Sequence, residues 1–191
     1  MSRSTARSWS TARTLSDLGN LTARWLEGDL ATLAGGAYRG GPDEETGPLV
    51  PVLAALNRSG HVTFQSQPGS DGPAFDGRRW RQRAAVMCLT GTEGLQLLTR
   101  TAHAHGLLLA VHRTVRRGPV RDILATTWDG EAITSFGGKI PKSYVRLTYR
   151  GCHREAVRAA VDAHQVTLVD PVWGRDTVLW PALTEAFTLT R

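Results

Sequence analysis

The sequence contains little cysteine: Cys88 and Cys152 are the only two among 191 residues. One pair cannot form the dense disulfide framework of a small secreted domain, and the spacing between the two fits no metal-binding pattern. We therefore expect two free thiols, no metal site and a cytoplasmic protein. A chain of this length can bury a hydrophobic core without disulfides or a metal ion.

Long hydrophobic runs are also absent. No stretch approaches the roughly 18 consecutive apolar residues of a membrane-spanning helix, and residues 1–15 lack the apolar segment of a secretory signal. We expect no membrane partner and interpret residues 1–15 as a flexible terminus. The HExxH, CxxC, GxSxG and P-loop patterns are all missing, so no motif assigns a catalytic group.

Lysine is scarce as well, although the net charge is +6. Lys139 and Lys142 are the only lysines, and the other 21 basic residues are arginines, whose planar guanidinium groups suit carboxylates and phosphates. Residues 78–121 hold nine arginines and one acid, whereas residues 42–46 hold three acids. This pattern predicts either a basic face for nucleic acid, a nucleotide or an acidic partner, or arginines that are solvated or paired internally. We favour the second interpretation.

Hydrophobic periodicity predicts both helices and strands. The predicted helices cover residues 14–34, 48–58, 93–105, 153–164 and 181–188. The predicted strands cover residues 61–66, 84–89, 107–115, 121–128, 131–137, 144–149 and 165–169. The dipeptide Asp129-Gly130 indicates a two-residue hairpin turn, and the glycine-rich stretches 35–47 and 67–77 are predicted to be loops.

The order of these elements predicts an α+β fold. We expect a mixed, mostly antiparallel sheet with helices packed on one face, built from two β-α-β units at 84–115 and 144–169. A ferredoxin-like core with additions is one concrete version of this two-layer sandwich. The loop at 35–47 would divide the chain into an N-terminal arm or helix at 1–34 and a single α+β domain at 48–191.

Three stretches of the sequence carry a resemblance to known proteins. They are Trp-Leu-Glu-Gly at 25–28, Gly-Pro-Asp-Glu-Glu-Thr-Gly-Pro-Leu-Val-Pro-Val-Leu-Ala-Ala-Leu-Asn-Arg-Ser-Gly at 41–60 and Ser-Gln-Pro-Gly at 66–69. They resemble a family of small actinomycete proteins known only as a domain of unknown function. The resemblance covers most of the chain and is strongest over residues 15–83. It implies a bacterial cytoplasmic protein, and it implies no activity, cofactor or catalytic residue.

The loop that follows the predicted strand 61–66 is the first candidate site. Hydroxyl and amide groups stand there at the end of a strand, a glycine permits close backbone approach, and arginines follow. This combination suits a phosphate-bearing aromatic ligand; the alternative is an ordinary turn with solvated arginines. The proposed ligand contacts are Ser66, Gln67, Gly69, Arg78, Arg79 and Arg81, with Asp71 and Asp76 as secondary candidates.

A second candidate is the loop 137–143, which contains Lys139 and Lys142. Glycines followed by a lysine can cradle phosphate through backbone N–H groups, although an exposed turn is the simpler interpretation. Cys152 precedes the predicted helix 153–164, where a thiol can become reactive. We favour a structural role for Cys152, because the residues after it form no glycine-rich phosphate loop.

These features leave three functional hypotheses. The first is a small cytoplasmic protein that binds a phosphate-containing ligand, either a nucleotide or a nucleic acid. The second is an enzyme acting on a nucleotide or RNA, with Asp71, Asp76 or the acids at 43–45 near the Ser66 loop as general base or Mg²⁺ ligands. The third is a protein-interaction module that docks through the helix at 14–34. The sequence specifies no cofactor and no oligomeric state.

Overall fold

The computed structural model describes residues 3–36, 38, 40–112 and 122–188. Its strands are β1 (Val62–Gln67), β2 (Ser70–Pro73), β3 (Arg79–Gln82), β4 (Ala85–Thr90), β5 (Leu108–His112), β6 (Ile123–Trp128), β7 (Glu131–Phe136) and β8 (His164–Val169). Its α-helices are α1 (Arg3–Thr11), α2 (Leu15–Leu26), α3 (Val50–Arg58), α4 (Thr92–His105), α5 (Lys142–Thr148), α6 (Arg154–Asp162) and α7 (Leu179–Thr188). Two short 3₁₀ helices are η1 (Ala34–Gly36) and η2 (Glu44–Leu49).

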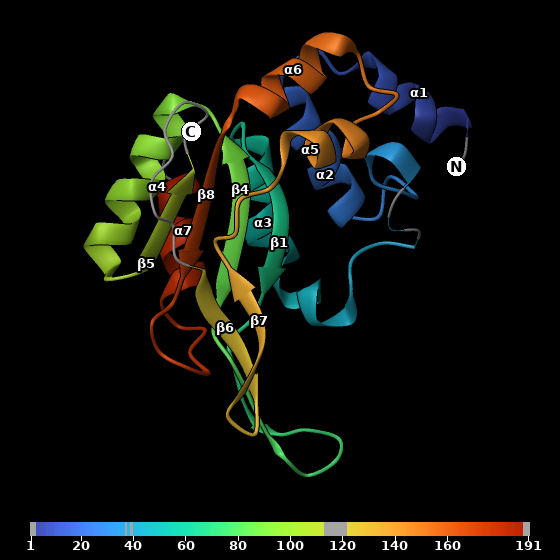
Figure 1. Ribbon diagram of the computed structural model, residues 1–191. Coiled ribbons are helices and arrows are strands. Elements are labelled where there is room, and N and C mark those ends of the chain that lie inside the picture. The colour runs from blue at the N-terminus through green and yellow to red at the C-terminus, as the bar shows by residue number, and fades with distance from the viewer. Residues whose placement is uncertain (1–2, 37, 39, 113–121, 189–191) are drawn as a thin grey trace.

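The strands form two four-stranded sheets (Figure 1). The first has the order β1-β4-β8-β5 and the second the order β2-β3-β6-β7, and every neighbouring pair is antiparallel. Helices α3, α4 and α7 lie behind the first sheet, and the β6–β7 hairpin lies in front of it (Figure 1). The α+β class is therefore confirmed, with two antiparallel sheets in place of one mixed sheet.

Only one of the two expected β-α-β units forms. Strands β4 and β5 are both antiparallel to β8, which lies between them, so β4-α4-β5 is the split β-α-β arrangement of a ferredoxin-like core. The strand expected at 144–149 was wrong, because residues 142–148 form helix α5. Val145 and Tyr149, the C-cap residue of α5, are both buried, and their spacing of four fits a helix.

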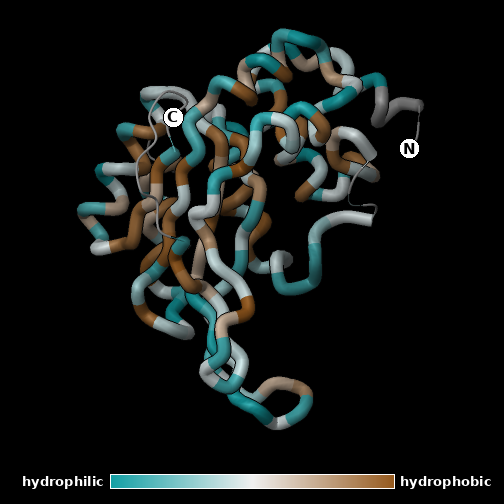
Figure 2. The backbone as a smooth tube through the Cα atoms, in the orientation of Figure 1, coloured by the Kyte–Doolittle hydropathy of each residue, from teal (hydrophilic) through white to brown (hydrophobic). Residues whose placement is uncertain are grey.

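The main hydrophobic core lies between the first sheet and the helices behind it. It joins alternate residues of the central strands, such as Val86 and Leu168, to Leu18 of α2 and Leu56 of α3. Figure 2 shows the same concentration of hydrophobic residues along β4, β8 and the neighbouring helices. A smaller cluster on the opposite face packs the first sheet against the second. Helix α2 therefore belongs to the same core as the sheet and does not stand apart as an arm.

The N-terminal region is more ordered than the sequence suggested. The expected flexible terminus contains helix α1, and Trp9 within it is 2% exposed; its Nε1 donates a hydrogen bond to the carbonyl of Thr32 at 3.1 Å. Helix α2 begins at Leu15, within one residue of the predicted start, and Thr14 caps it through a capping box with Asp17. It ends at Leu26 rather than at 34, because Gly28 takes a positive φ of 87°.

One long β-ribbon runs through both sheets. Strands β1 and β2 form one side and β3 and β4 the other, and from Gln65 outward they keep one register, in which Gln67 faces Ala85 and Ser70 faces Gln82. The predicted loop at 67–77 is thus largely strand, and its turn is confined to residues 75–77, where Gly77 has a φ of 82°. A three-residue turn ending in a left-handed glycine is a common hairpin connection. The outer half of this ribbon projects from the molecule (Figure 1).

The second predicted hairpin is confirmed. Strands β6 and β7 pair across Asp129 and Gly130, whose φ values of 51° and 87° fit the tight turn predicted for Asp-Gly. The strand predicted at 107–115 is β5 over residues 108–112, and the rest of it lies outside the described residues. The helices at 93–105, 153–164 and 181–188 are confirmed within a few residues.

A buried histidine gives the fold an expected sensitivity to acid. His61 is 3% exposed, and burial lowers its pKa from 6.5 to about 4. Between pH 6.5 and pH 4, His61 is therefore protonated in the unfolded chain and neutral in the folded one. The free energy of unfolding falls as the pH drops through this range. The loss should reach on the order of 3 kcal/mol. Urea unfolding across this pH range measures it.

A His61→Gln variant tests the assignment of this acid sensitivity. The variant should unfold with a clearly flatter pH dependence between pH 6.5 and 4, because glutamine does not titrate. The matched control is His105→Gln, since His105 is exposed on α4 and should leave the pH dependence unchanged. Equal pH slopes in the wild type and His61→Gln would contradict the role of His61.

Candidate functional site

The Ser66 loop lies at the point where the ribbon passes from one sheet to the other. The side-chain amide of Gln67 is buried there and donates hydrogen bonds to the carbonyls of Arg83 and Ala125 at 2.9 and 3.2 Å. Gly69 approaches another part of the chain, since a Cβ on it would lie 2.7 to 2.9 Å from backbone atoms of Arg175. Both residues therefore shape the junction of the sheets, and neither presents a free group to a ligand.

The segment 170–178 secures this junction. Asp170 is fully buried and accepts hydrogen bonds from the guanidinium of Arg175 at 2.7 to 3.0 Å and from the N–H of Val172 at 2.9 Å. Asp176 accepts hydrogen bonds from the N–H of Gly69 and from Trp180 Nε1. This close-packed polar network has a structural role.

The arginines of the first candidate site are paired within the ribbon. Arg78 lies 2.6 Å from Asp76, and Asp71 lies 2.9 Å from Arg79 and 3.3 Å from Arg81. The hydrogen bonds from these arginines hold the pKa of both carboxyl groups below the usual range. The structure thus brings Asp71 and Asp76 to the arginines rather than to Ser66.

The described arginines at 78–83 of the wider basic region also make internal contacts. Arg78 stacks at 4.2 Å over the ring of Trp128, while Arg81 and Arg83 lie 5.2 and 4.2 Å from the ring of Trp173. Such cation–π pairs hold guanidinium groups against the protein. Four of the nine arginines counted in 78–121 fall at 113–121, outside the described residues.

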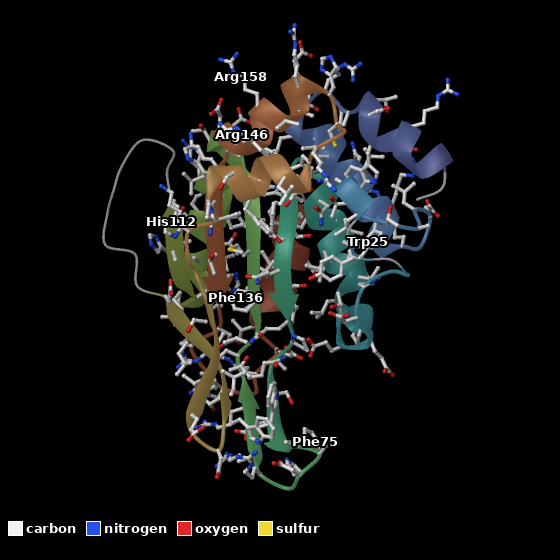
Figure 3. All side chains as sticks on the ribbon, turned by 45° about the vertical axis from the view of Figure 1, so that its right-hand side comes forward. Trp25, Phe75, His112, Phe136, Arg146 and Arg158 are labelled. Carbon is white, nitrogen blue, oxygen red and sulfur yellow. The ribbon has the colours of Figure 1, made fainter. Side chains whose placement is uncertain are left out.

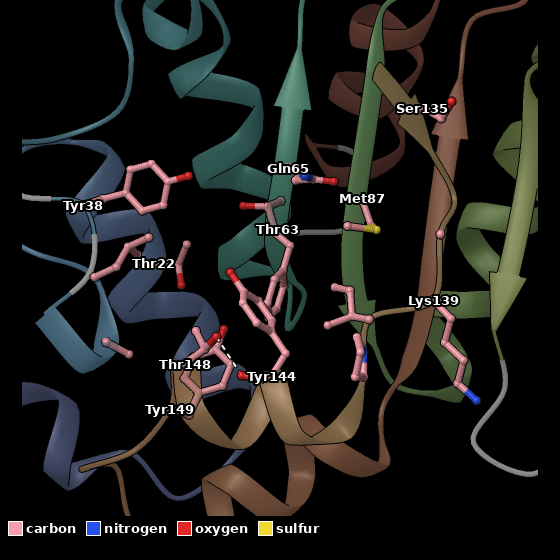
Figure 4. A pocket seen from close by; sticks show the side chains of 16 residues that line it. Thr22, Tyr38, Thr63, Gln65, Met87, Ser135, Lys139, Tyr144, Thr148 and Tyr149 are labelled. Atoms are coloured by element: carbon pink, nitrogen blue, oxygen red, sulfur yellow. Dashed lines mark hydrogen bonds between the residues drawn. The ribbon is translucent and has the colours of Figure 1, made fainter. Parts of the chain in front are cut away.

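A cleft of about 450 Å³ opens on the front face of the first sheet (Figure 4). Its size is in the range of small-molecule sites. It lies between β1 and β4, the N-terminal helical region, helix α5 and the loop before α5. Its lining is formed by Thr22, Leu33, Ala34, Tyr38, Thr63, Phe64, Gln65, Met87, Ser135, Gly138, Lys139, Ile140, Pro141, Tyr144, Thr148 and Tyr149.

A β-bulge in β1 builds one wall of this cleft. The register with β4 shifts between Thr63 and Gln65, and a bulge re-aims side chains that would otherwise alternate between faces. Consequently three consecutive residues, Thr63, Phe64 and Gln65, line the same cleft. Phe64 also lies edge-on to Tyr149, with 6.1 Å between ring centroids.

The cleft combines aromatic rings with uncharged hydrogen-bonding groups. Tyr38 and Tyr144 are 62% and 54% exposed at its rim, and the hydroxyl of Tyr38 points toward Gln65 and Thr63 (Figure 4). Tyr149 is buried, and burial raises the pKa of its phenol, which keeps it protonated. Such a surface can stack a planar ligand and bond its polar edges.

A second recess of about 240 Å³ continues the cleft along β1. It shares Tyr38, Phe64 and Gln65 with the first part and adds Ser66 of the predicted site. Asp43 and Glu45 also line it. Two exposed residues of the acidic stretch 43–45 therefore share one recess with Ser66, as the enzyme hypothesis requires.

The lysine loop forms part of the cleft rim. Gln165 holds the loop by donating to the carbonyl of Gly138 at 2.5 Å and accepting from the N–H of Ile140 at 2.8 Å, so that N–H is not free for phosphate. Lys139 is exposed and turned away from Tyr38 and Thr63 (Figure 4). Lys142 lies 3.9 Å from Asp162. Among the described residues that line the cleft, Lys139 is the one with a positive charge.

The cysteines take no part in the cleft. Both are free thiols, as predicted. Burial raises the pKa of Cys152 to about 11 and that of Cys88 to about 12, so neither thiol is a nucleophile at neutral pH. Among the described residues no three His, Cys, Asp or Glu side chains gather in a metal-binding group.

The sequence predicted only part of this site. It identified Lys139 at the cleft and Ser66 and Gln67 at the second recess, but it missed the aromatic and amide groups that the two hollows share. The sequence signals for these groups were weak: Gln65 is a polar residue within the predicted strand 61–66, and Tyr144 falls within the predicted strand 144–149. These groups converge because β1 has a bulge and α5 is a helix. The hydrophobic pattern of the sequence predicts neither feature. The missed residues are Tyr38, Gln65, Ser135 and Tyr144.

Fold and cleft together define an α+β protein with a ligand-sized hollow between its first sheet and its N-terminal helical region. Residues 4–190 match the family described as "Domain of unknown function (DUF6919)", and the chain belongs to that family. No curated protein shows a significant match to the chain. Within the part of the chain that the structure describes, no helix is long and apolar enough to span a membrane.

Proposed function

We propose that the protein binds a small nucleotide-like ligand in the cleft beside β1. The observation that carries this proposal is the cleft of about 450 Å³ in which aromatic rings stand beside hydroxyl and amide groups. Sites of this size usually hold one ligand through an apolar body and a few placed polar groups. The nucleotide is preferred to a nucleic acid, because Arg78, Arg79 and Arg81 pair with carboxylates of their own ribbon.

The proposed ligand would place its planar ring between Tyr38, Phe64 and Tyr144. Thr63, Gln65 and Ser135 would bond its polar edges. Lys139 makes no ion pair with any described residue and stands at the rim, where its flexible side chain can turn to meet a phosphate. In this arrangement the ring supplies the buried area and the phosphate remains near solvent.

The proposal is tested by titrating the full chain with the four ribonucleoside 5′-monophosphates and their nucleosides, observed by heteronuclear NMR. At least one monophosphate should bind saturably and at least fivefold more tightly than its nucleoside. Tyr144→Ala should weaken that binding at least tenfold, because the variant removes one face of the aromatic wall. Lys139→Ala should remove the preference for the phosphate.

The matched control is Leu147→Ala. Leu147 lies on the same helix as Tyr144, is 56% exposed against 54%, and does not line the cleft. It should therefore leave the dissociation constant unchanged. Absence of saturable shifts with all eight compounds at millimolar concentration would refute the proposal, and so would equal effects of the two variants.

An enzyme is the second candidate function, and the position of Asp43 and Glu45 favours it. Both carboxylates line the recess that contains Ser66, where either could take a proton from water or from a ligand hydroxyl. If the protein turns over a bound monophosphate, Asp43→Asn or Glu45→Gln should lower the rate at least a hundredfold with little change in binding. Mass spectrometry of the incubated compounds measures this turnover.

The proposal includes a bacterial cytoplasmic location. It is supported by Cys88 and Cys152, both of which are free thiols, as expected in a reducing compartment.

The hypothesis of a protein-interaction module that docks through α2 is not favoured, since Leu18, Leu21 and Trp25 of α2 are buried in the protein's own core.

A further inference from the structure

The tip of the projecting ribbon carries an aromatic cluster that belongs to neither hydrophobic core. Trp128 is at its centre, with ring centroids 5.7 Å from Phe75 and 6.5 Å from Trp80. Phe75 is 94% exposed and stands at the end of the ribbon, far from the cleft (Figure 3). Figure 2 shows a short hydrophobic stretch in this otherwise hydrophilic tip.

An open groove of about 390 Å³ lies beside this cluster, and we call it the tip groove. Trp80 and Trp128 face each other across β3 and β6, so part of their surface is used to hold the two hairpins together. Phe75 has no such cross-strand partner and exposes nearly its whole ring. The groove is lined by Ser70, Gly72, Pro73, Ala74, Phe75, Trp80 and Trp128.

The charge around the tip groove is opposite to that of the whole protein. The net charge of the chain is +6, yet residues 70–81 and 128–131 contain four acids and three arginines. All three arginines are paired, Arg78 with Asp76, and Arg79 and Arg81 with Asp71. Asp129 and Glu131 are exposed and make no ion pair within the described part of the chain, and Arg78 is the arginine that both attract.

This charge selects among the classes of partner that an aromatic groove can bind. A single-stranded nucleic acid would stack on the rings, but its phosphates would meet Asp129 and Glu131, and Arg78 beside them is already paired with Asp76. A proline-rich peptide packs its rings into aromatic grooves and is already extended, so binding costs it little conformational entropy. Basic residues beside the prolines would complement the two acids.

We propose that the tip groove docks a proline-rich segment of a partner protein, flanked by arginine or lysine. The prolines pack against Phe75, Trp80 and Trp128, and the flanking cation pairs with Asp129 or Glu131. This docking is independent of any ligand in the cleft, because none of these residues lines it.

The test is a fluorescence anisotropy titration of the full chain with labelled synthetic probes. One peptide has seven prolines flanked by two arginines at each end, and the second has the same prolines flanked by glutamates. A ten-residue oligothymidylate is the third probe. The arginine-flanked peptide should bind saturably, at least tenfold more tightly than the glutamate-flanked one, and more weakly as salt rises. The oligothymidylate should not bind.

Two variants locate the binding on the tip groove. Phe75→Ala should weaken the arginine-flanked peptide at least tenfold, and Glu131→Gln should weaken it severalfold. Leu147→Ala removes an exposed apolar side chain on α5 and should have no effect; circular dichroism verifies that all three variants are folded. Equal binding of both peptides, binding unaffected by Phe75→Ala, preferred binding of the oligothymidylate, or no binding at millimolar concentration would each overturn the proposal.

Discussion

Replacing Asp170 by alanine is expected to lower the free energy of unfolding by about 2 to 3 kcal/mol. Asp170 is 0% exposed and holds both Arg175 and the N–H of Val172. Its loss would leave the N–H of Val172 without its acceptor, which is costly for a buried donor, whereas the guanidinium of Arg175 is one-third exposed and can turn to water. Urea unfolding followed by circular dichroism measures the change.

Two further variants separate the charge from the hydrogen bonds. Asp170→Asn keeps an acceptor for Val172 but removes the charge, so we expect a smaller loss than with alanine. Asp71→Ala breaks an exposed pair with Arg79 in the ribbon and should change stability far less, because water screens that pair. If Asp71→Ala and Asp170→Ala lowered the free energy of unfolding equally, burial of the carboxylate would not explain the size of the loss.

Replacing Gly19 by alanine should destabilise the protein by about 3 kcal/mol, against the usual effect of this change in a helix. In an isolated helix alanine is favoured over glycine by about 1 kcal/mol. Here the added Cβ would lie 2.3 Å from the carbonyl oxygens of Asn57 and His61. These oxygens belong to the backbone and cannot rotate out of the way as a side chain can. Helix α2 must therefore shift away from α3, which loosens the packing of the core.

The control for Gly19→Ala is Asn20→Ala, one position further along the same helix. Asn20 is exposed, so alanine there should stabilise slightly through helix propensity alone. Urea unfolding of both variants gives the comparison. A stabilised Gly19→Ala variant would contradict the close packing of α2 on α3.

The sequence predicted those parts of the fold that depend on local chemistry. The helix predicted to begin at residue 14 starts after the cap Thr14, the helix predicted to end at 105 stops at the left-handed Gly106, and Asp129-Gly130 forms the predicted turn, because caps and tight turns require particular residues at particular positions. Features that depend on distant contacts were missed. Gly72 and Pro73 read as a loop, yet they form β2 because the facing strand β3 offers backbone partners.

The candidate site shows the same division. Proximity in sequence suggested that Ser66 acts with Arg78 and Arg81. The ribbon carries those arginines away along its length and pairs them with Asp71 and Asp76 instead. The groups that do gather around β1 come from four distant parts of the chain, and no local pattern could join them.

The position of β8 has a consequence for the order in which the protein can be built. β8 is the last strand in the sequence but lies inside the first sheet, and β5 pairs with no other described strand. During synthesis the two sides of the ribbon at residues 62–90 are available to each other early. In contrast, β5 has no pairing strand until β8, more than 50 residues later in the sequence, has been made. Long-range pairing of this kind is slow and leaves strand edges open to other chains. A growing chain is therefore most vulnerable to aggregation just before β8 leaves the ribosome.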